Sequence, residues 1–246
     1  MPYKFKHLLI LGANSDIAEQ VAYHAAKEKI SLTLCSRNID KLMALQSDIV
    51  AKHETKVYIS QFDADKIDGH KNFYESLTEK PDAVLCSFGI LGEQEKAEKD
   101  DSWQNIIQTN FIGAVSILNI IANDFEQRKH GFIAGISSVA GERGRQSNYF
   151  YGAAKAGLTT YLSGLRNRLY PHKVSVLTVK PGFVKTKMID GLKTPELLTA
   201  NPSKLAKAIL KGMNKGKNNI YYKPIWFLIM SIIKSIPEFI FKKLKL

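Results

Sequence analysis

The sequence predicts one doubly wound α/β domain, with a parallel seven-stranded sheet covered by helices on both faces, followed by a basic, apolar helical tail. Short apolar runs alternate with longer helix-patterned segments over residues 7–222. Several of these runs are continuously apolar, which is typical of strands buried on both faces. No repeat, low-complexity stretch or Pro/Gly linker divides the 246 residues. We therefore expect a single domain over 1–222 and an extension over 223–246.

The elements follow from these patterns in chain order. Strands are expected where β-like apolar runs end at turn residues, at 7–11, 31–36, 56–60, 82–87, 132–137, 173–179 and 219–222. Helices are expected where apolar residues recur three and four positions apart, at 16–28, 39–52, 71–77, 102–125, 149–170 and 202–213. Ligands of such sheets bind beyond the carboxyl ends of the strands. The loops at those ends therefore carry the candidate site residues.

The composition is that of a globular domain, with 45% hydrophobic and 24% charged residues. The net charge of +12 favours anionic partners such as nucleic acid, an anionic membrane or acidic ligands. The apolar run at 8–11 is too short for a signal peptide, so we expect a cytoplasmic protein. Cys35 and Cys86 lie in apolar runs and are expected to be buried free thiols, with no disulfide or metal-ligand spacing.

The first turn is a candidate nucleotide site. Gly12 follows the first predicted strand, and Asn14, Ser15, Asp16 and Ile17 lead into the first predicted helix. Free N–H groups at a helix N-terminus suit a diphosphate. A dinucleotide turn usually has three glycines, however, and this segment has one. Asp16 can instead cap the helix, so this segment alone leaves nucleotide binding open.

The end of the second strand indicates which nucleotide would bind. No acid stands at the position that would hold the adenosine ribose of NAD, where the sequence reads Ser36-Arg37-Asn38. Arg37 can pair with a ribose 2′-phosphate, which favours NADP(H); the alternative is a solvated surface arginine. Asp63, just after the third strand, can bond the adenine amino group or be a plain turn residue.

Tyr151 and Lys155 are the candidate proton-transfer pair. They lie four residues apart in a predicted helix, on one face. A nearby ammonium favours the phenolate and lowers the pKa of a tyrosine from its ordinary value of about 10. The positive nicotinamide ring of an oxidised cofactor would add to this effect. Such a tyrosine can act as an acid near neutral pH, although the pair alone is also typical of an ordinary helix face.

Three further features support this pair. Ser138 ends a strand thirteen residues before Tyr151, and its hydroxyl can hold a substrate carbonyl oxygen. Asn110 lies inside a predicted helix, where asparagine is unfavourable, which indicates a specific role. The segment 181–186 follows the sixth strand, where a loop can meet a nicotinamide.

Together these motifs resemble the short-chain dehydrogenase/reductase family over residues 5–222. The matching pieces, in the family's order and spacing, are the segment 12–18, Asn110, Ser138, Tyr151, Lys155 and the segment 181–186. The resemblance implies a Rossmann-type fold, a nicotinamide cofactor and, since members commonly form dimers and tetramers, a homodimer or homotetramer.

The resemblance also implies residue roles. Tyr151 would donate a proton to a carbonyl, or accept one in the reverse direction. Lys155 would lower the pKa of Tyr151 and bind the nicotinamide ribose, and Ser138 would orient and polarise the carbonyl. Asn110 would support a water-linked proton relay to Lys155. Thr186 would contact the nicotinamide amide or the diphosphate, beside a pocket shaped by the 181–182 backbone.

The expected cofactor contacts are spread over all the carboxyl-end loops. They are Gly12, Asn14, Ser15, Asp16, Ile17, Arg37, Asp63, Gly89, Lys155, Pro181, Gly182, Val184 and Thr186. The chain departs from the family's pattern in the glycine-poor turn 11–18. It departs again at Cys86-Ser87-Phe88-Gly89, where Asn-Asn-Ala-Gly is usual. These departures affect the diphosphate and adenosine contacts rather than the fold.

The C-terminal tail is the third departure. The apolar run 225–233 is shorter than the roughly 20 residues that span a bilayer. From Lys223 onward there are five lysines and one acid, Glu238, interleaved with aromatic and aliphatic residues. This pattern predicts an interfacial helix on an anionic leaflet, at the cytosolic face of a membrane. The alternative is packing on the domain or on a sister subunit. Nucleic acid is not expected, since no recognition motif is present.

The tail and the Asp16-Ile17-Ala18 segment are similar to a subgroup that reduces keto-sugars on polyprenyl phosphates, the decaprenylphosphoryl 2-keto-pentose reductases. We expect an NADPH-dependent carbonyl reductase acting on such a substrate, or on an acyl ketone, a sterol-like ketone or a retinoid-like aldehyde. The region 187–201 is apolar and is expected to cover the substrate. The alternatives are a soluble 3-oxoacyl-thioester reductase with an oligomerising tail, and a non-catalytic nucleotide-sensing module.

Overall fold

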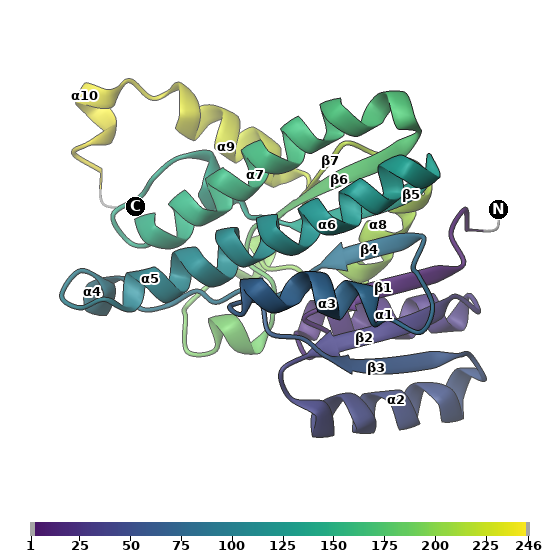
Figure 1. Cartoon of the computed structure of the whole chain (residues 1–246). Helices are drawn as coiled ribbons and strands as arrows, with labels where there is room; N and C mark the ends of the chain where they lie inside the picture. Colours follow the sequence, from purple (N-terminus) through teal and green to yellow (C-terminus); the bar gives the residue numbers. More distant parts are fainter. Residues whose placement is uncertain (1–2, 245–246) are drawn as a thin grey trace.

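The computed structural model describes residues 3–244 and contains a seven-stranded, all-parallel sheet of order β3-β2-β1-β4-β5-β6-β7 (Figure 1). The strands are β1 His7–Leu11, β2 Ser31–Ser36, β3 Val57–Gln61, β4 Ala83–Cys86, β5 Gly131–Ile136, β6 Val174–Pro181 and β7 Asn219–Tyr222. The predicted fold class is therefore confirmed. The strand order reverses between β1 and β4, and such switch points open a crevice at the carboxyl edge.

Helices connect the strands and cover both faces of the sheet. They are α1 Asp16–Lys27, α2 Ile39–His53, α3 His70–Glu75, α4 Gln94–Ala97, α5 Ser102–Ile107, α6 Gly113–Arg128, α7 Tyr149–Leu169, α8 Pro202–Asn214, α9 Ile225–Ser235 and α10 Glu238–Phe241. Within 3–244, each helix expected from the sequence is present with ends displaced by a few residues. The short α4 was not expected.

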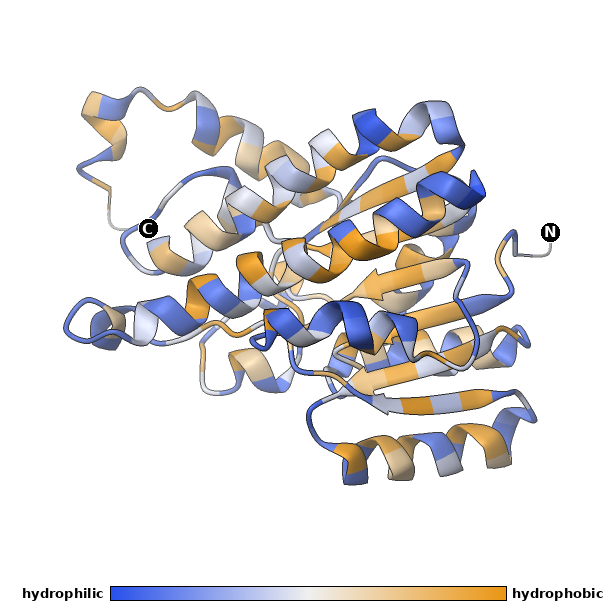
Figure 2. Ribbon diagram, viewed as in Figure 1, coloured by the Kyte–Doolittle hydropathy of each residue, from blue (hydrophilic) through white to orange (hydrophobic). Residues whose placement is uncertain are grey.

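The core has two layers because strand side chains alternate between faces. On β1, Leu8 and Ile10 pack with α1, α2 and α8, whereas Leu9 and Leu11 pack with α6 and α7. All four side chains are fully buried, and Figure 2 shows the same apolar character along the central strands. Burying each such side chain stabilises the fold by about 1.5–3 kcal/mol. This rigid sheet fixes the loops at its carboxyl edge.

The expected helix 102–125 is interrupted. The turn Gln108–Ile112 between α5 and α6 is a π-helix, and Asn110 lies at its centre. Such bulges are frequent at functional sites, which agrees with the specific role expected for a mid-helix asparagine. Residues 102–128 are long and apolar enough to cross a membrane by length and composition, but half of the apolar stretch is buried inside the domain.

The tail packs on the domain through one face. Trp226 and Met230, one turn apart on α9, are buried with Val139 in a small third core. The guanidinium of Arg143 donates to the carbonyls of Ile233 and Ile236 at the end of α9. Figure 1 shows α9 and α10 together at one end of the molecule. One of the five tail lysines, Lys245, lies outside the described residues.

Candidate active site

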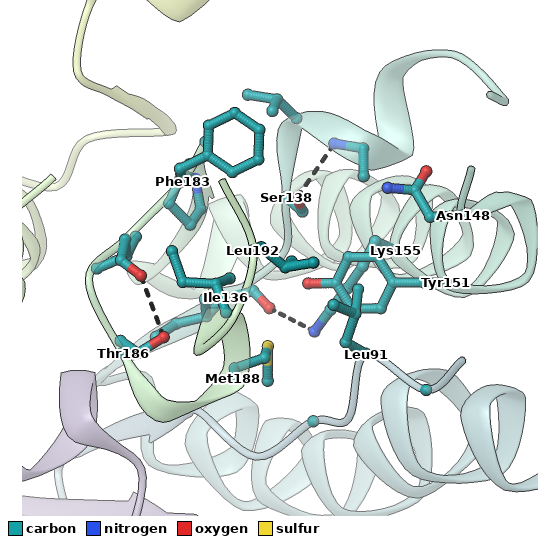
Figure 3. Close-up of a pocket in the computed structure, with 18 of the residues that line it drawn as sticks. Leu91, Ile136, Ser138, Asn148, Tyr151, Lys155, Phe183, Thr186, Met188 and Leu192 are labelled. Carbon is teal, nitrogen blue, oxygen red and sulfur yellow. Dashed lines mark hydrogen bonds between the residues drawn. The ribbon is translucent and has the colours of Figure 1, made fainter. Parts of the chain in front are cut away.

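A cavity of about 940 Å³ opens at the carboxyl edge of the sheet (Figure 3). Its walls are the turn before α1, the loops after β4, β5 and β6, and the first turns of α7. Ser138, Tyr151 and Lys155 all line it. Residues that are far apart in the sequence, and that the sequence predicted to act together, are therefore brought to one cavity.

The catalytic candidates have a defined geometry. The Lys155 ammonium lies 5.6 Å from the ring centroid of Tyr151 and donates to the Ile136 carbonyl at 3.0 Å. The Ser138 hydroxyl accepts from the Ala140 N–H at 3.1 Å, and Ser138 and Tyr151 line the same cavity. Figure 3 shows the hydroxyls of Ser138 and Tyr151 both at the cavity. A carbonyl oxygen placed between them would meet two hydroxyl groups.

The titration of this pair differs from the sequence expectation. Burial raises the pKa of Tyr151 to about 12, and its hydrogen bond with Ser138 offsets part of that rise. Burial also lowers the pKa of Lys155 to about 8. Desolvation disfavours the charged form of each group. The chain's own residues therefore do not produce the lowered tyrosine pKa that we expected from the pair.

The neighbouring Ser137 positions the catalytic helix, and the sequence reasoning missed it. Its hydroxyl donates to the Lys155 carbonyl at 2.9 Å and lies 2.6 Å from the Thr159 hydroxyl. A Cβ on Gly141 would lie 2.6 Å from the backbone nitrogen of Ala156, so the loop after β5 closely contacts α7. The sequence signal for Ser137 was its place in a pair of adjacent serines at the end of a strand. Because successive strand residues point to opposite sides of the sheet, the two serines were expected to have different neighbours.

Asn110 is buried behind the cavity and does not line it. Its amide nitrogen donates to the carbonyls of Ile90 at 2.7 Å and Ile106 at 2.8 Å, and its oxygen accepts from the Ile90 N–H at 3.2 Å. A Cβ on Gly89 would lie 2.5 Å from the Asn110 oxygen and 3.3 Å from the Lys155 nitrogen. Asn110 therefore holds the loop that separates it from Lys155, and the expected relay stays a prediction.

The turn before α1 forms the opposite end of the cavity, lined by Asn14, Ser15, Asp16 and Ile17. Gly12 has φ +84°, and a Cβ there would lie 2.6 Å from the Phe88 nitrogen, so only glycine fits. Ser15, and not Asp16, is the N-cap of α1 and accepts from the Ala18 N–H at 3.3 Å.

Two of these turn residues are tied to neighbouring segments. The Asn14 amide donates to the Ser36 hydroxyl at 2.5 Å, which joins the turn to the end of β2. The Asp16 carboxylate accepts from the Lys187 N–H at 2.7 Å, which joins it to the loop after β6. Asp16 therefore has a different role from the helix cap considered above.

Gly12, Arg37 and Asp63 do not line the cavity. Arg37 follows β2, its side chain is 66% exposed, and its nearest guanidinium nitrogen is 3.8 Å from a carboxylate oxygen of Asp65. The Asp63 carboxylate accepts from the Asp65 N–H at 3.2 Å. Both residues lie at the carboxyl edge of the sheet, where the sequence placed them, but the structure does not bring them to the catalytic cavity.

The loop after β6 forms the last wall. Pro181, Gly182, Val184 and Thr186 line the cavity as expected, and the Thr186 hydroxyl donates to the Val184 carbonyl at 3.1 Å. A Cβ on Gly182 would lie 2.0 Å from the indole of Trp226, so the tail helix contacts this loop directly.

Trp226 itself lines the cavity, although nothing in the sequence paired it with the loop at 181–186. Phe183, which also lines it, belongs to the segment 181–186 that was expected to meet the nicotinamide. Other lining residues that were not predicted include Leu91, Arg145 and Asn148. The apolar content of the tail was the available signal for Trp226. No sequence feature was specific for the other unpredicted residues.

The residues fit a nicotinamide dinucleotide. The N-terminus of α1 lines the cavity at the end away from Tyr151, where its free N–H groups suit a diphosphate, and Ser15 and Gly89 line the same cavity. A doubly wound sheet with this turn, and with Ser138, Tyr151 and Lys155 on one wall, defines the class of nicotinamide-dependent oxidoreductases.

Comparison with known proteins agrees with this class. The family model described as short chain dehydrogenase matches residues 6–196. An uncharacterized oxidoreductase of Mycobacterium tuberculosis strain H37Rv is 31% identical over 243 residues, which cover 96% of each chain. The protein therefore belongs to the short-chain dehydrogenase family and is an oxidoreductase of that family.

Solved structures share the fold. A short-chain dehydrogenase from Sphingobium yanoikuyae in complex with NADPH superposes with a TM-score of 0.82 at 20% identity, covering 94% of this chain and 96% of that one. A 3-oxoacyl-[acyl-carrier protein] reductase from Brucella melitensis with bound NAD has a TM-score of 0.77 at 18% identity, covering 88% and 89%. The fold thus accommodates either nicotinamide cofactor.

Proposed function

We propose that the protein is an NADP(H)-dependent reductase of a lipophilic or lipid-linked carbonyl compound, working at an anionic membrane surface. The observation that carries the proposal is the meeting of Ser138, Tyr151 and Lys155 on one wall of the cavity whose far end is the N-terminus of α1. The substrate class follows from the apolar wall of that cavity.

Side chains of the protein hold the carbonyl oxygen and donate the proton. NADPH, held by the turn 14–17 and Lys155, would supply a hydride to the carbonyl carbon. The hydroxyls of Ser138 and Tyr151 hold the carbonyl oxygen, and Tyr151 donates its phenolic proton to it as the C–O double bond becomes a C–O single bond. The product is an alcohol, and Tyr151 is left as a phenolate. In the reverse direction the phenolate takes the proton back.

Lys155 stabilises that phenolate and holds the cofactor ribose. Its ammonium is already oriented by the Ile136 carbonyl at 3.0 Å. A cation next to a developing anion in a dry site is worth more than in water. Asn110, which fixes the loop at Gly89, would keep the proton path to Lys155 open.

The preference for NADP(H) rests on Arg37. It stands at the end of β2, beside the switch point, with an exposed guanidinium. Its only carboxylate neighbour within residues 3–244 is Asp65, 3.8 Å away, which is a weak surface pair. A ribose 2′-phosphate can replace this pairing with a bidentate one.

The substrate half of the cavity is apolar. Phe183, Met188, Leu192 and Trp226 line it, together with Leu91 from the opposite loop. Four of these side chains surround Ser138 and Tyr151 in Figure 3, namely Leu91, Phe183, Met188 and Leu192. Such walls favour a substrate with an apolar body, such as a polyprenyl chain, and disfavour a small hydrophilic ketone.

The outer face of α9 supports membrane contact. Phe227, Leu228 and Ile232 are 61%, 60% and 56% exposed, while the opposite face of the helix is buried. Phe239 and Ile240 on α10 are also exposed, and Lys242 and Lys243 follow. Exposed apolar bulk beside lysines suits the interface of an anionic leaflet. Because Trp226 on the same helix lines the cavity, the membrane would lie next to the substrate entrance.

Activity is tested by NADPH oxidation with a panel of ketones and aldehydes graded by chain length. We expect turnover that increases with apolar chain length. No NADPH oxidation with any member, despite tight NADPH binding, would instead favour a nucleotide-sensing module. Equal turnover of soluble 3-oxoacyl thioesters would favour the acyl-thioester alternative.

Membrane contact is tested by flotation with vesicles of phosphatidylglycerol and phosphatidylcholine. The wild type should float, and the triple variant Phe227→Ser, Leu228→Ser, Ile232→Ser should stay in solution. The control variant Met43→Ser, Val50→Ser removes exposed apolar residues of α2, remote from the tail, and should float. A wild type that stays in solution at low salt, and whose mass in solution is lowered by the triple variant, would assign the face to a sister subunit.

A further inference from the structure

We propose that Asp16 is a positioning residue, which holds the loop 187–199 over the reaction site through a hydrogen bond to the start of that loop. Its carboxylate, in the first turn of α1, accepts from the Lys187 N–H at 2.7 Å across 171 positions of the chain. The inference rests on the proposed function, because it concerns how cofactor and substrate are retained beside Tyr151. It gives the acid of the nucleotide turn a role that neither a helix cap nor a diphosphate contact describes.

The loop 187–199 leaves the domain through a short stem. At this stem the Lys185 N–H donates to the Ala200 carbonyl at 3.0 Å, and the Ala200 N–H donates to the Phe183 carbonyl at 2.8 Å. Beyond the stem, the loop contributes several residues to the wall of the cavity, namely Lys187, Met188, Ile189, Leu192, Lys193 and Thr194. The placement of the loop therefore decides how the substrate half of the cavity is covered.

Asp16 is the residue of the nucleotide turn that fixes this loop. Among the described residues, hydrogen bonds join 187–199 to segments beyond its own stem at three places. One is the bond to Asp16. The other two come from the tail, where the Lys223 ammonium donates to the Leu197 carbonyl at 2.7 Å and the Trp226 indole donates to the Leu198 carbonyl at 3.3 Å. Asp16 thus holds the first part of the loop, and the tail holds the last part.

The bond satisfies a backbone donor that the loop leaves without a partner. Lys187 begins the 3₁₀ helix Lys187–Ile189, and the preceding Thr186 makes no capping bond because its hydroxyl donates to the Val184 carbonyl. The first N–H groups of a helix have no partner within it. A carboxylate acceptor makes a charge-assisted bond, about twice as strong as a neutral one. The exposed Lys187 ammonium, 3.8 Å from the other carboxylate oxygen, adds little.

The bonded pair lies between the two parts of the site that would hold the cofactor. Asp16 follows Ser15, the N-cap residue of the nucleotide turn, and Lys187 follows Thr186, which is expected at the nicotinamide or the diphosphate. All four residues line the cavity, and Figure 3 shows Thr186 and Met188, the residues on either side of Lys187, at its wall. Loss of the bond would free the loop at its first turn, so that cofactor and substrate would leave more readily.

Glu19 provides the contrast within the same helical turn. Asp16 and Glu19 are both acids in the first turn of α1, where either one stabilises the helix through its dipole. The Glu19 carboxylate makes no hydrogen bond or ion pair with the described residues of the loop, whereas the Asp16 carboxylate makes both. A role in helix stability is therefore shared by the two acids, and the loop contact belongs to Asp16.

The test compares Asp16→Asn with Asp16→Ala. Both variants remove the negative charge from the nucleotide turn, but only Asp16→Asn keeps an oxygen that can accept from the Lys187 N–H. In Asp16→Ala, the rate of NADPH release, measured by stopped-flow fluorescence, and the KM for farnesal should both rise about 10-fold. Asp16→Asn should lie between this variant and the wild type. The single-turnover rate at saturating farnesal should stay near the wild-type value in both variants.

Hydrogen exchange gives a readout that needs no turnover. With NADP⁺ bound, peptides from 187–199 should exchange faster in Asp16→Ala than in Asp16→Asn or the wild type, because the loop opens more often. Glu19→Ala is the matched control and should change neither NADPH release nor loop exchange. Asp16→Ala and Glu19→Ala should lower the unfolding temperature by similar small amounts, since each loses one acid of the first helical turn.

Three outcomes would overturn the inference. Equal NADPH release from Asp16→Asn and Asp16→Ala would mean that the charge, and not the hydrogen bond, decides the effect. Slower release in both variants would mean that Asp16 repels the diphosphate. An effect of the same size in Glu19→Ala would reduce the role of Asp16 to helix stability.

The same measurements separate this inference from the proposed function. If NADPH release and loop exchange depended on Asp16 while no carbonyl compound were reduced, the positioning role would stand and the catalytic proposal would fail. If farnesal were reduced while loop exchange in Asp16→Ala equalled that of the wild type, the catalytic proposal would stand and the positioning role would fail.

Discussion

Lys155 holds its ammonium 5.6 Å from the ring centroid of Tyr151 while donating to the backbone carbonyl of Ile136 at 3.0 Å. The ammonium is thus fixed by β5, and it lies close enough to act on the phenolate without being bonded to it. The Lys155 backbone is fixed as well, by the Ser137 hydroxyl at 2.9 Å. Both the ammonium and the backbone of Lys155 are therefore held before any substrate arrives.

This arrangement predicts that Tyr151→Phe loses activity without losing the cofactor. The variant keeps the ring and its packing but lacks the proton that the carbonyl oxygen requires, so turnover should fall by about 100- to 10,000-fold. NADPH affinity, measured by fluorescence titration, should stay within a few-fold of the wild type. Turnover near the wild-type value would remove Tyr151 from the mechanism.

The buried Lys155 predicts a pH limit for reduction. Because burial lowers its pKa to about 8, the ammonium is lost through that pH rather than above 10. The charged form stabilises the phenolate, so kcat/KM with NADPH should decrease as the pH rises through about 8. A profile that stays flat through that range would show that the lysine charge is not needed.

The lowered pKa of Lys155 also predicts that the fold becomes more stable as the pH rises, whereas activity falls. The folded-state pKa lies below the unfolded value of 10.5. Between about 8 and 10.5 the unfolded chain binds the proton and the folded chain does not, so the free energy of unfolding should rise with pH. Lys155→Met should abolish that rise, which denaturant titrations at several pH values would measure.

Sequence reasoning located most of the fold and the catalytic wall because both follow local rules. The alternation of strands and helices, and the four-residue spacing of Tyr151 and Lys155, are visible within short windows. The unfavourable mid-helix position of Asn110 indicated a specific role, and the π-helical turn gives the physical reason. At this interruption of the α-helix, the Asn110 side chain donates hydrogen bonds to the backbone carbonyls of Ile90 and Ile106.

The remaining site residues depend on packing between distant segments, which short windows do not contain. Trp226 reaches the cavity because Gly182 has no side chain to exclude it. Arg143 and Arg145 are equivalent in the sequence, and only the position of the tail separates a structural arginine from an unpartnered one. The raised pKa of Tyr151 follows from burial, which the helix spacing alone could not reveal.

Arg37 predicts the cofactor preference. Arg37→Asp should weaken NADPH binding by about 10- to 100-fold, since it removes a charge-assisted pair and adds repulsion, and should leave NADH binding unchanged or stronger. Lys56→Asp is the matched charge reversal at the opposite edge of the sheet, before β3, and should change neither affinity. An unaltered ratio of the two affinities in Arg37→Asp would assign the 2′-phosphate to another residue.

Glu142 joins the tail to the domain, and its removal should destabilise both. Its carboxylate contacts the buried Lys180 at 2.5 Å, Lys234 of α9 at 2.6 Å and the Tyr221 hydroxyl at 3.1 Å. Glu142→Gln leaves the Lys180 charge buried without a counter-charge, which should lower the free energy of unfolding by about 3 kcal/mol. Glu126→Gln, which breaks the more exposed pair with Arg168, should cost about 1 kcal/mol or less.

The contribution of Glu142 should also depend on pH in a defined direction. Burial raises the pKa of Glu142, but the hydrogen bonds from Lys180 and Lys234 outweigh it and hold the pKa below 4.5. A depressed carboxyl pKa stabilises the fold above the unfolded value, and that stability is lost as pH falls through the folded value. The stability difference between the wild type and Glu142→Gln should therefore shrink below pH 4.5. A difference that stays constant with acidification would mean that Glu142 acts through packing rather than through its charge.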